Sequence, residues 1–471
     1  MYRKESQRLQ MRIDDFILPF GGKLSAENRW VKLAKLMPWD MIEDIYAEKF
    51  KNDKPDGNIP ISSRAAFGAL HIRGDGKFSD EMTVGNIAEN PYLQYFLGYK
   101  EFQTEPPFDV SMMTHFRKRF TAEDIRKINE ELFRRMNPPK NDPPSSDENK
   151  GTLILDATAA PGDVSYPTDL LLLNECRENV EKLIDVVWEH SKKHGHKTSY
   201  NRKKARKQYL KVAKQRKPKR KAIKYAVTGQ LDYVERSLSD IDKLLLQVPE
   251  NALTDRQKER LEVIREVARQ QRKHAENPME SIPDRIVNLR QSHIRPIVRG
   301  KAGAPVEFGQ KLAFSVVDGF TFIEKQSFDN FNEGITLQES VQKYRERHGC
   351  WPEAVLADTI YRTRDNIKFC KERGIRLSGP RLGRPKKEEI EADREQAYRD
   401  SCERNMVESR NGIAKRRYGL NRILAYLENT AQTEAAFVVL AMNAAHALRV
   451  LLRHFMETVS GRVRVVQFVG I

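Results

Sequence analysis

Two aspartates occupy positions from which they could act together on a phosphodiester. Asp156 interrupts the apolar run 152–158, and Asp358 ends a second apolar run, 354–358. An ionised carboxylate in a buried strand is destabilising unless it is paired, protonated or bound to a metal ion. Carboxylate oxygens suit Mg²⁺, and a pair of such ions activates the attacking oxygen and stabilises the leaving oxygen of a phosphate ester. An Asp156 that only caps a neighbouring turn is the alternative interpretation.

A third carboxylate, Glu408, lies in a predicted helix. Arg404, Glu408, Asn411 and Lys415 are spaced by four, three and four residues, which places them on one helical face. Glu408 could complete a metal site, the two cations could hold phosphates, and Asn411 is a further candidate DNA contact. An ordinary ion-pair ladder on the surface of a helix would show the same spacing.

Other aspartates compete for these roles. Asp163 and Asp169 are alternatives for the first metal position, and Asp318 is an alternative for the second. Asp318 precedes Gly319 in a two-residue turn, which accounts for it without catalysis. We therefore favour Asp358 for the second position.

Composition and charge narrow the class of protein. The 471 residues include 83 Lys and Arg against 66 Asp and Glu, a formal charge of +17, which indicates a polyanionic partner and most simply nucleic acid. The sequence has no glycine-rich phosphate loop of an NTPase, and its four cysteines lack zinc-ligand spacing, which fits a reducing cytosol. His194 and His196 lie in a basic stretch and are discounted as ligands.

Membrane association is not expected. The N-terminus has no apolar signal segment. The long apolar stretch 435–452 predicts a buried helix of a soluble protein, because three polar residues interrupt it on one side. These residues are Asn443, His446 and Arg449.

The N-terminal part of the chain is predicted to be all-helical. Residues 62–72 and 79–89, separated by Gly74-Asp75-Gly76, resemble a helix-turn-helix on composition, and Arg117 and Lys118 are candidate DNA contacts. Such a pattern is common to most compact helical domains. The predicted helices cover 28–50 with a break at Pro38, 62–72, 79–89, a segment from Pro91 capped by Asn90, and a segment from Thr121 that begins with a capping box.

A long helical segment follows Asp169. Leu231, Val234, Leu238, Ile241 and Leu245 repeat as a coiled-coil seam does. The preceding segment 201–225 is crowded with Lys and Arg and has almost no acid, which favours a phosphate-binding arm over a solvated face and indicates disorder without DNA. Its candidate DNA contacts are Lys203, Lys204, Arg206, Lys207, Arg216, Lys219 and Arg220.

Past Pro296 the hydrophobic period changes from helical to two. The order of elements predicts a mixed sheet covered by helices, an α/β domain whose site forms at strand ends. The expected strands are 152–158, a hairpin of 306–317 and 320–328 turning at Asp318-Gly319, 354–358 and 375–378, and the expected helices are 335–348, 366–373 and 388–417.

Several motifs resemble the DDE transposases of bacterial insertion sequences, most closely the insertion sequence four and five group. They are Leu155-Asp156-Ala157-Thr158 with Tyr166-Pro167-Thr168-Asp169, Ala357-Asp358-Thr359-Ile360-Tyr361, Arg404 with Glu408 and Lys415, and, upstream, 27–33, 89–96 and 115–119. Two features depart from the family pattern. Ser401 stands where the third motif often has Tyr, and the long insert follows the first strand, whereas better-known relatives carry theirs after the fifth.

The resemblance implies an RNase H-like catalytic domain. It implies Asp156, Asp358 and Glu408 as the metal-binding triad, with Arg404 and Lys415 on DNA. The expected domains are an N-terminal helical DNA-binding domain (1–145), a catalytic domain (151–169 and 303–455), a basic helical insertion (170–302) and a C-terminal tail (456–471).

The function that this resemblance implies is transposition. The enzyme would use two Mg²⁺ ions per site, with Mn²⁺ able to substitute, to cut double-stranded DNA at the terminal repeats and to join the 3′-hydroxyl to target DNA. We expect a homodimer on DNA in the bacterial cytoplasm, associated with the nucleoid. The alternatives are an inactive, sequence-specific DNA-binding protein derived from a transposase, and a structure-selective nuclease with the same fold.

Overall fold

The computed structural model describes residues 12–18, 21–50, 60–138, 148–191, 202–301, 304–380 and 389–459. The chain forms two compact units, each described by itself. The first comprises Met1–Pro161, Lys311–Ser327 and Phe331–Ile471, and the second comprises Gly162–Gln310 with Phe328–Asn330. His194, His196, Asn201 and most of the expected tail 456–471 lie outside the described residues.

The N-terminal part of the first unit is helical, as predicted. Side-chain caps start several of the helices: Asn28 and Asn90 accept from backbone N–H groups two residues on, and Thr121 forms a capping box with Asp124. The helices are α1 (Arg29–Leu36), α2 (Trp39–Glu48), α3 (Ser63–Gly76), α4 (Asp80–Glu89), α5 (Pro91–Phe96), α6 (Met112–Arg119) and α7 (Ala122–Met136), after a short 3₁₀ turn at Ile13–Asp15.

The turn expected at Gly74-Asp75-Gly76 was wrong. Helix α3 continues through Gly76 and ends at Lys77, whose φ of 53° is left-handed. The prediction failed because glycine only weakens a helix, and α3 is buried along most of its length.

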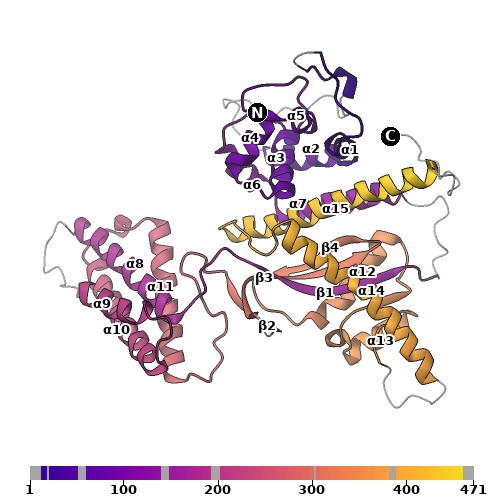
Figure 1. Cartoon of the computed structure of the whole chain (residues 1–471). Helices are drawn as coiled ribbons and strands as arrows, with labels where there is room; N and C mark the ends of the chain where they lie inside the picture. The colour runs from indigo at the N-terminus through magenta and orange to yellow at the C-terminus, as the bar shows by residue number, and fades with distance from the viewer. Residues whose placement is uncertain are drawn as a thin grey trace. The chain divides into compact units, whose positions relative to one another are not determined.

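The chain contains the predicted mixed sheet (Figure 1). The strands run in the order β2-β3-β1-β5-β6, and β4 pairs with β3. β1 and β5 are parallel, as are β5 and β6, whereas β2–β3 and β3–β4 are antiparallel. The strands are β1 (Thr152–Pro161), β2 (Arg295–Lys301), β3 (Ala304–Val317), β4 (Phe320–Ser327), β5 (Ala354–Leu356) and β6 (Arg376–Leu377).

The hairpin between β3 and β4 is confirmed, and β2 was missed. Asp318 and Gly319 have φ values of 50° and 79°, which is the geometry of a tight two-residue hairpin turn. β2 begins at Arg295-Pro296 and shows little alternation of apolar and polar residues, so no strand was predicted there.

Helices cover both faces of the sheet. On one face, Leu153, Leu155 and Val355 pack with side chains of α7, α12 (Leu337–His348) and α13 (Arg364–Glu372). On the other face, Ile154 and Leu356 pack with Val407 of α14 (Glu389–Arg417). The alternation of side chains along β1 and β5 therefore separates two apolar layers, and the α/β, RNase H-like arrangement expected from the motifs is present.

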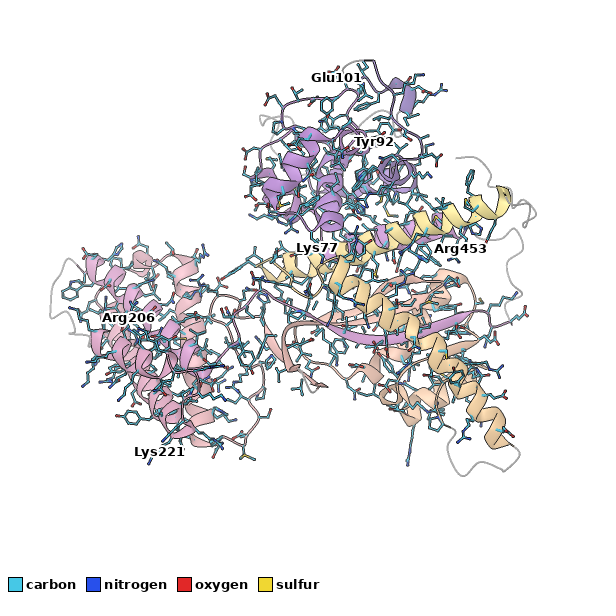
Figure 2. The ribbon with its side chains drawn as sticks, viewed as in Figure 1. Lys77, Tyr92, Glu101, Arg206, Lys221 and Arg453 are labelled. Atoms are coloured by element: carbon cyan, nitrogen blue, oxygen red, sulfur yellow. The ribbon has the colours of Figure 1, made fainter. Side chains whose placement is uncertain are left out.

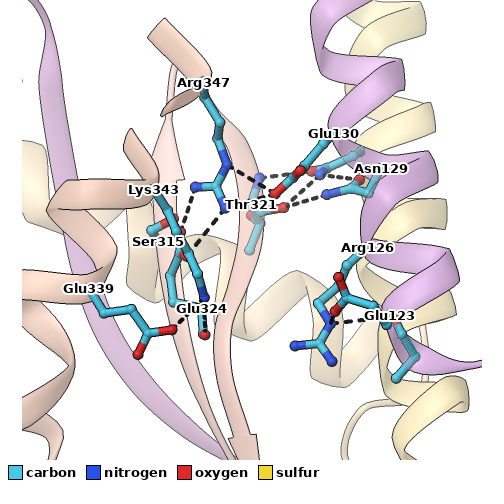
Figure 3. Close-up of polar contacts among 12 residues, drawn as sticks. Glu123, Arg126, Asn129, Glu130, Ser315, Thr321, Glu324, Glu339, Lys343 and Arg347 are labelled. Carbon is cyan, nitrogen blue, oxygen red and sulfur yellow. Dashed lines mark hydrogen bonds and ion pairs between the residues drawn. The ribbon is translucent and has the colours of Figure 1, made fainter. Parts of the chain in front are cut away.

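A bridge of charged residues joins α7, β4 and α12 (Figure 3). Arg347 of α12 donates to buried Glu324 of β4 over 2.6 Å and to Glu130 of α7 over 3.0 Å. Ser315 of β3 donates to Glu324 as well. These contacts attach the last helix of the N-terminal part to the sheet.

The last helix, α15 (Glu428–Val459), packs against α7 and β4. Among the described helices, it alone is long and apolar enough to cross a membrane, and 61% of its most apolar window is buried in the protein. Asn443 is fully buried and hydrogen-bonds the Thr321 carbonyl and the Asn129 side chain. This internal polar contact supports the prediction of a buried core helix.

The helices of the second unit form a bundle. Helices α8 (Asp169–His190), α10 (Arg220–Leu245) and α11 (Asp255–Glu276) share one apolar core, which includes the predicted seam of α10. The disorder expected for the basic segment was wrong, because α9 (Arg202–Ala213) is helical and Val212 packs with Leu170 and Ala226. An apolar stripe every three to four residues stabilises this helix despite its charge.

Candidate active site

The parallel pairing of β1 and β5 places Asp156 and Asp358 level with each other. Ile154 pairs with Leu356, and each aspartate lies two residues further along its strand direction. Because side chains alternate along β1, Asp156 points to the face of Ile154. Asp358 lies two residues past the end of β5, where Arg404 of α14 contacts it. Neighbouring strands lie about 4.8 Å apart, so the two carboxylates are near neighbours at one edge of the sheet.

Helix α14 brings the third carboxylate to this edge. Val407 packs against Ile154 and Leu356, which fixes the helix on the same face as the two aspartates. Glu408 follows directly in the chain. The sequence therefore positions the acidic residue by means of its apolar neighbour.

Side chains of α14 contact both aspartates. Asn411 donates a hydrogen bond from Nδ2 to Oδ2 of Asp156 over 2.8 Å. Arg404 lies between the other two carboxylates, with Nη1 3.6 Å from Asp358 and Nη2 3.8 Å from Glu408. Lys415 is half-buried one turn beyond Asn411. The helical face predicted from the spacing of four, three and four residues is thus turned toward the strand ends.

The expected burial of the aspartates was wrong. Asp156 is half-buried, the Asp358 side chain is 59% exposed and the Glu408 side chain is 62% exposed. β5 ends at Leu356, and Asp358 caps the following short 3₁₀ helix by accepting from the Thr359 N–H over 2.6 Å. The site is therefore open to a substrate as large as a nucleic acid.

Tyr361 lies beneath the site and was given no role from the sequence. Its side chain is fully buried, and burial raises the pKa of its hydroxyl well above the ordinary value, with Glu333, Asp156 and Asp358 adding to the effect. The residue stays neutral and forms part of the floor under the aspartates. Its place three residues after Asp358 was the signal available in the sequence.

The donor set is suited to a hard divalent cation in its chemistry. All three acidic residues offer oxygen, and the buried Asn411 Oδ1 has no hydrogen-bond partner among the described residues. Within those same residues, no three His, Cys, Asp or Glu side chains are grouped closely enough to hold a metal ion. Arg404 supplies the positive charge between Asp358 and Glu408 in this structure.

The competing aspartates have other contacts. Asp318 occupies the hairpin turn, where its carbonyl oxygen contacts His446 Nε2 at 3.0 Å. Asp163 and Asp169 belong to the second unit. Asp169 accepts hydrogen bonds from Arg285 over 2.6 Å and from Gln271 over 2.9 Å. These bonds connect the first residue of α8 to Arg285 and to α11.

The basic segment presents its cations to solvent. Arg202 is bound to Asp185 over 2.8 Å, but the next cations along α9 and into α10 form no ion pair within the described part of the chain. Figure 2 labels two of these residues, Arg206 and Lys221. The exposed candidate contacts are Lys203, Lys204, Arg206, Lys207, Arg216, Lys219 and Arg220.

The two candidates on α6 differ from each other. Lys118 is exposed, whereas Arg117 donates two hydrogen bonds to Asp80, over 2.7 and 2.8 Å, and its side chain is 21% exposed. Both terminal nitrogens of the Arg117 guanidinium are therefore bound to the carboxylate of Asp80 on α4.

Lys77 was not recognised from the sequence. Its Nζ donates to the carbonyl oxygen of Arg416 at the end of α14, and Figure 2 labels it. This contact holds the C-terminus of the helix that carries Glu408. No local signal could reveal it, because the two residues are 339 positions apart.

Comparisons with known proteins agree with the motifs. Residues 19–119 match the family described as Transposase domain (DUF772), and residues 355–444 match the Transposase DDE domain. The second match contains Asp358, Glu408 and the basic residues of α14, and it begins after β1.

One curated relative is the uncharacterized protein ORF8 in the nfe locus of Rhizobium meliloti. It is 28% identical over 165 residues, which are 35% of this chain and 73% of the relative. No solved structure matches the chain.

Transposases bind DNA, and DDE transposases typically use divalent metal ions. Both matched families are transposase domains, and the sheet, the strand-end aspartates and α14 have the arrangement that the motifs predict. The chain is therefore similar, over these two segments, to transposase domains, in agreement with its resemblance to the DDE transposases of bacterial insertion sequences.

Proposed function

We propose that this transposase cuts the phosphodiesters at the ends of its element and joins the freed 3′-hydroxyl to target DNA. Asp156, Asp358 and Glu408 would form the active site. The observation that carries the proposal is the contact of α14 with both aspartates, through Asn411 to Asp156 on β1 and through Arg404 to Asp358 just past the end of the parallel strand β5.

The two aspartates would hold the cations from the sheet, and Glu408 would complete the ligand set from α14. Bound Mg²⁺, two ions per site with Mn²⁺ able to substitute, would activate the attacking oxygen and stabilise the leaving oxygen. Asn411 would orient Asp156, and Arg404 would contact a DNA phosphate beside Asp358. One site serves both cleavage and joining, because each is an in-line displacement at phosphorus.

DNA binding would be divided among the parts of the chain. The exposed cations of α9 and α10, together with Lys118 and Lys415, would contact phosphates, and the N-terminal helices would supply base recognition. We propose domain limits of 1–145, 151–169 with 303–455, and 170–302, and a homodimer, since two element ends require two active sites. The enzyme would work in the bacterial cytoplasm as a member of the insertion sequence four and five group.

Cleavage of a labelled duplex carrying the terminal repeat of the element tests the proposal. Wild type, Asp358→Asn and Asp318→Asn are compared with and without Mg²⁺. The expected result is Mg²⁺-dependent cleavage that is lost only in Asp358→Asn, because the amide removes one negative charge from the metal site. Tight end binding without cleavage by the wild type would instead indicate the inactive DNA-binding protein, and equal affinity for end and random duplexes would indicate the structure-selective nuclease.

A further inference from the structure

Arg410 is a buried cation without a carboxylate partner. It lies on α14 two residues after Glu408, and is therefore turned to a different side of the helix, since successive residues are rotated by about 100°. Arg410 is 7% exposed, and its Nη2 lies 2.8 Å from Nδ1 of His446 on α15. Its Nε and Nη1 have no protein partner among the described residues, yet neither is a fully buried atom.

His446 holds this guanidinium in one orientation. Burial lowers the pKa of His446 to about 4, with a further contribution from Arg410, so the ring is neutral. Its Nε2–H donates to the carbonyl oxygen of Asp318 over 3.0 Å, and its Nδ1 lone pair accepts from Arg410. The hairpin turn, α15 and α14 thus fix Arg410 through a single chain of hydrogen bonds.

Gly319 leaves the room that this arrangement needs. Its φ is +79°, and a Cβ there would lie 2.6 Å from His446 Nε2 and 2.7 Å from Arg410 Nη2. Any side chain at this position would displace the guanidinium or the imidazole. Glycine at this position therefore allows both the hairpin turn and the close approach of Arg410 and His446.

Two further arginines extend the charge along α15. Arg449 and Arg453 follow His446 by three and seven residues, so the three residues lie on one face of the helix. Both are exposed, Figure 2 labels Arg453, and throughout the described ranges none of the three arginines forms an ion pair with Asp or Glu. Burial, with a smaller contribution from Arg449, lowers the pKa of Arg410 to about 10, so the group remains charged at neutral pH.

Three guanidinium groups without acids repel one another, and a bound anion would offset this repulsion. We infer that Arg410, Arg449 and Arg453 form a binding site for backbone phosphates of DNA, separate from the face of α14 that carries Glu408 and from the cations of α9 and α10. A guanidinium presents a planar fork of donors that matches a phosphate, and a fork held in place loses little freedom on binding. This inference rests on the proposed function only in taking DNA as the polyanion.

The test is the salt dependence of DNA binding by the full-length protein. The probe is a random-sequence duplex, and binding is measured between 50 and 200 mM salt without Mg²⁺. The slope of log K against log salt is negative, and each lost phosphate contact lowers its magnitude by about 0.9. We expect a decrease of about 1 for Arg410→Gln and of about 1 to 2 for Arg449→Gln/Arg453→Gln.

Two comparisons keep the result interpretable. Arg345→Gln removes the same charge from α12, which carries none of the three arginines, and should leave the slope unchanged. The double variant changes only exposed side chains, so it tests the site even if Arg410→Gln disturbs the fold.

Unchanged slopes in both Arg410→Gln and the double variant would overturn the site while leaving Mg²⁺-dependent end cleavage, and so the proposed function, intact. A slope lowered equally by Arg345→Gln would also overturn it, because the effect would then reflect net charge alone. No duplex binding by the wild type would overturn both proposals.

Discussion

Asn411 on α14 donates a hydrogen bond to Asp156 on β1 over 2.8 Å, which joins the helix of the third carboxylate to the strand of the first. The other amide atom, Oδ1, is buried without a partner among the described residues. The contact orients one carboxylate oxygen of Asp156. A displacement of α14 would therefore also displace the Asp156 side chain, through Asn411.

Replacing Asn411 should weaken metal binding more than folding. In Asn411→Ala, Asp156 loses the donor that orients it, and loss of such an outer contact typically lowers metal affinity about 10–100-fold. We expect the Mg²⁺ concentration for half-maximal cleavage of the end duplex to rise by that factor. Asn86→Ala, which removes a half-buried amide from α4, is the matched control. An unchanged Mg²⁺ dependence would show that Asn411 does not orient the site.

Lys77 should stabilise the fold through its hydrogen bond and destabilise it through its left-handed backbone conformation. Lys77→Ala loses the hydrogen bond to the Arg416 carbonyl, which is worth about 1 kcal/mol, and keeps a side chain at a φ of 53°. Lys77→Gly loses the same bond but favours the left-handed backbone by about 0.5–1 kcal/mol. We therefore expect Lys77→Ala to unfold at a lower denaturant midpoint than Lys77→Gly, with wild type at or above the glycine variant. The reverse order of the two variants would contradict this assignment.

The fold should lose stability on mild acidification, with His71 as one cause. His71 is fully buried on α3, burial lowers its pKa to about 4, and neither ring nitrogen has a hydrogen-bond partner among the described residues. Between pH 6.5 and about 4 the unfolded chain binds a proton that the folded protein does not, so stability falls as pH falls. The fully developed effect of this shift is roughly 3 kcal/mol.

His71→Phe should reduce this loss. The ring keeps its packing against Trp30 and Phe96 but cannot titrate, so thermal unfolding should depend less on pH between 6.5 and 4.5 than in the wild type. His446, with a pKa also lowered to about 4, preserves part of the dependence and gives the variant a residual slope. Identical pH profiles for variant and wild type would show that His71 does not take part.

Features encoded by short-range patterns could be predicted from the sequence, and features set by distant contacts could not. The caps at Asn90 and Thr121, the Asp318-Gly319 turn and the α14 face follow from a few adjacent residues, and each is present. The occupied fork of Arg117 depends on Asp80, 37 positions away, and has no signature in its own segment.

Burial was the property most often misjudged. The apolar run before Asp358 suggested a carboxylate inside the core, but β5 is only three residues long and the aspartate lies beyond its end. The charge of the segment after Arg202 suggested disorder, but Val212 lies at a core position and anchors α9. In both cases the composition of the segment did not determine burial. The tertiary position of one residue, Asp358 or Val212, decided the outcome.

The place where the chain enters and leaves the second unit has a consequence for how such enzymes diversify. Gly162, the first residue of the unit, donates a hydrogen bond to the carbonyl of Phe308, two residues before its main segment ends at Gln310. Adjacent entry and exit points allow a module to be gained, exchanged or deleted with little loop-closure entropy. The helices α8 to α11 lie between β1 and β2 in the chain, so we expect related proteins that share this sheet to differ in the helices inserted there.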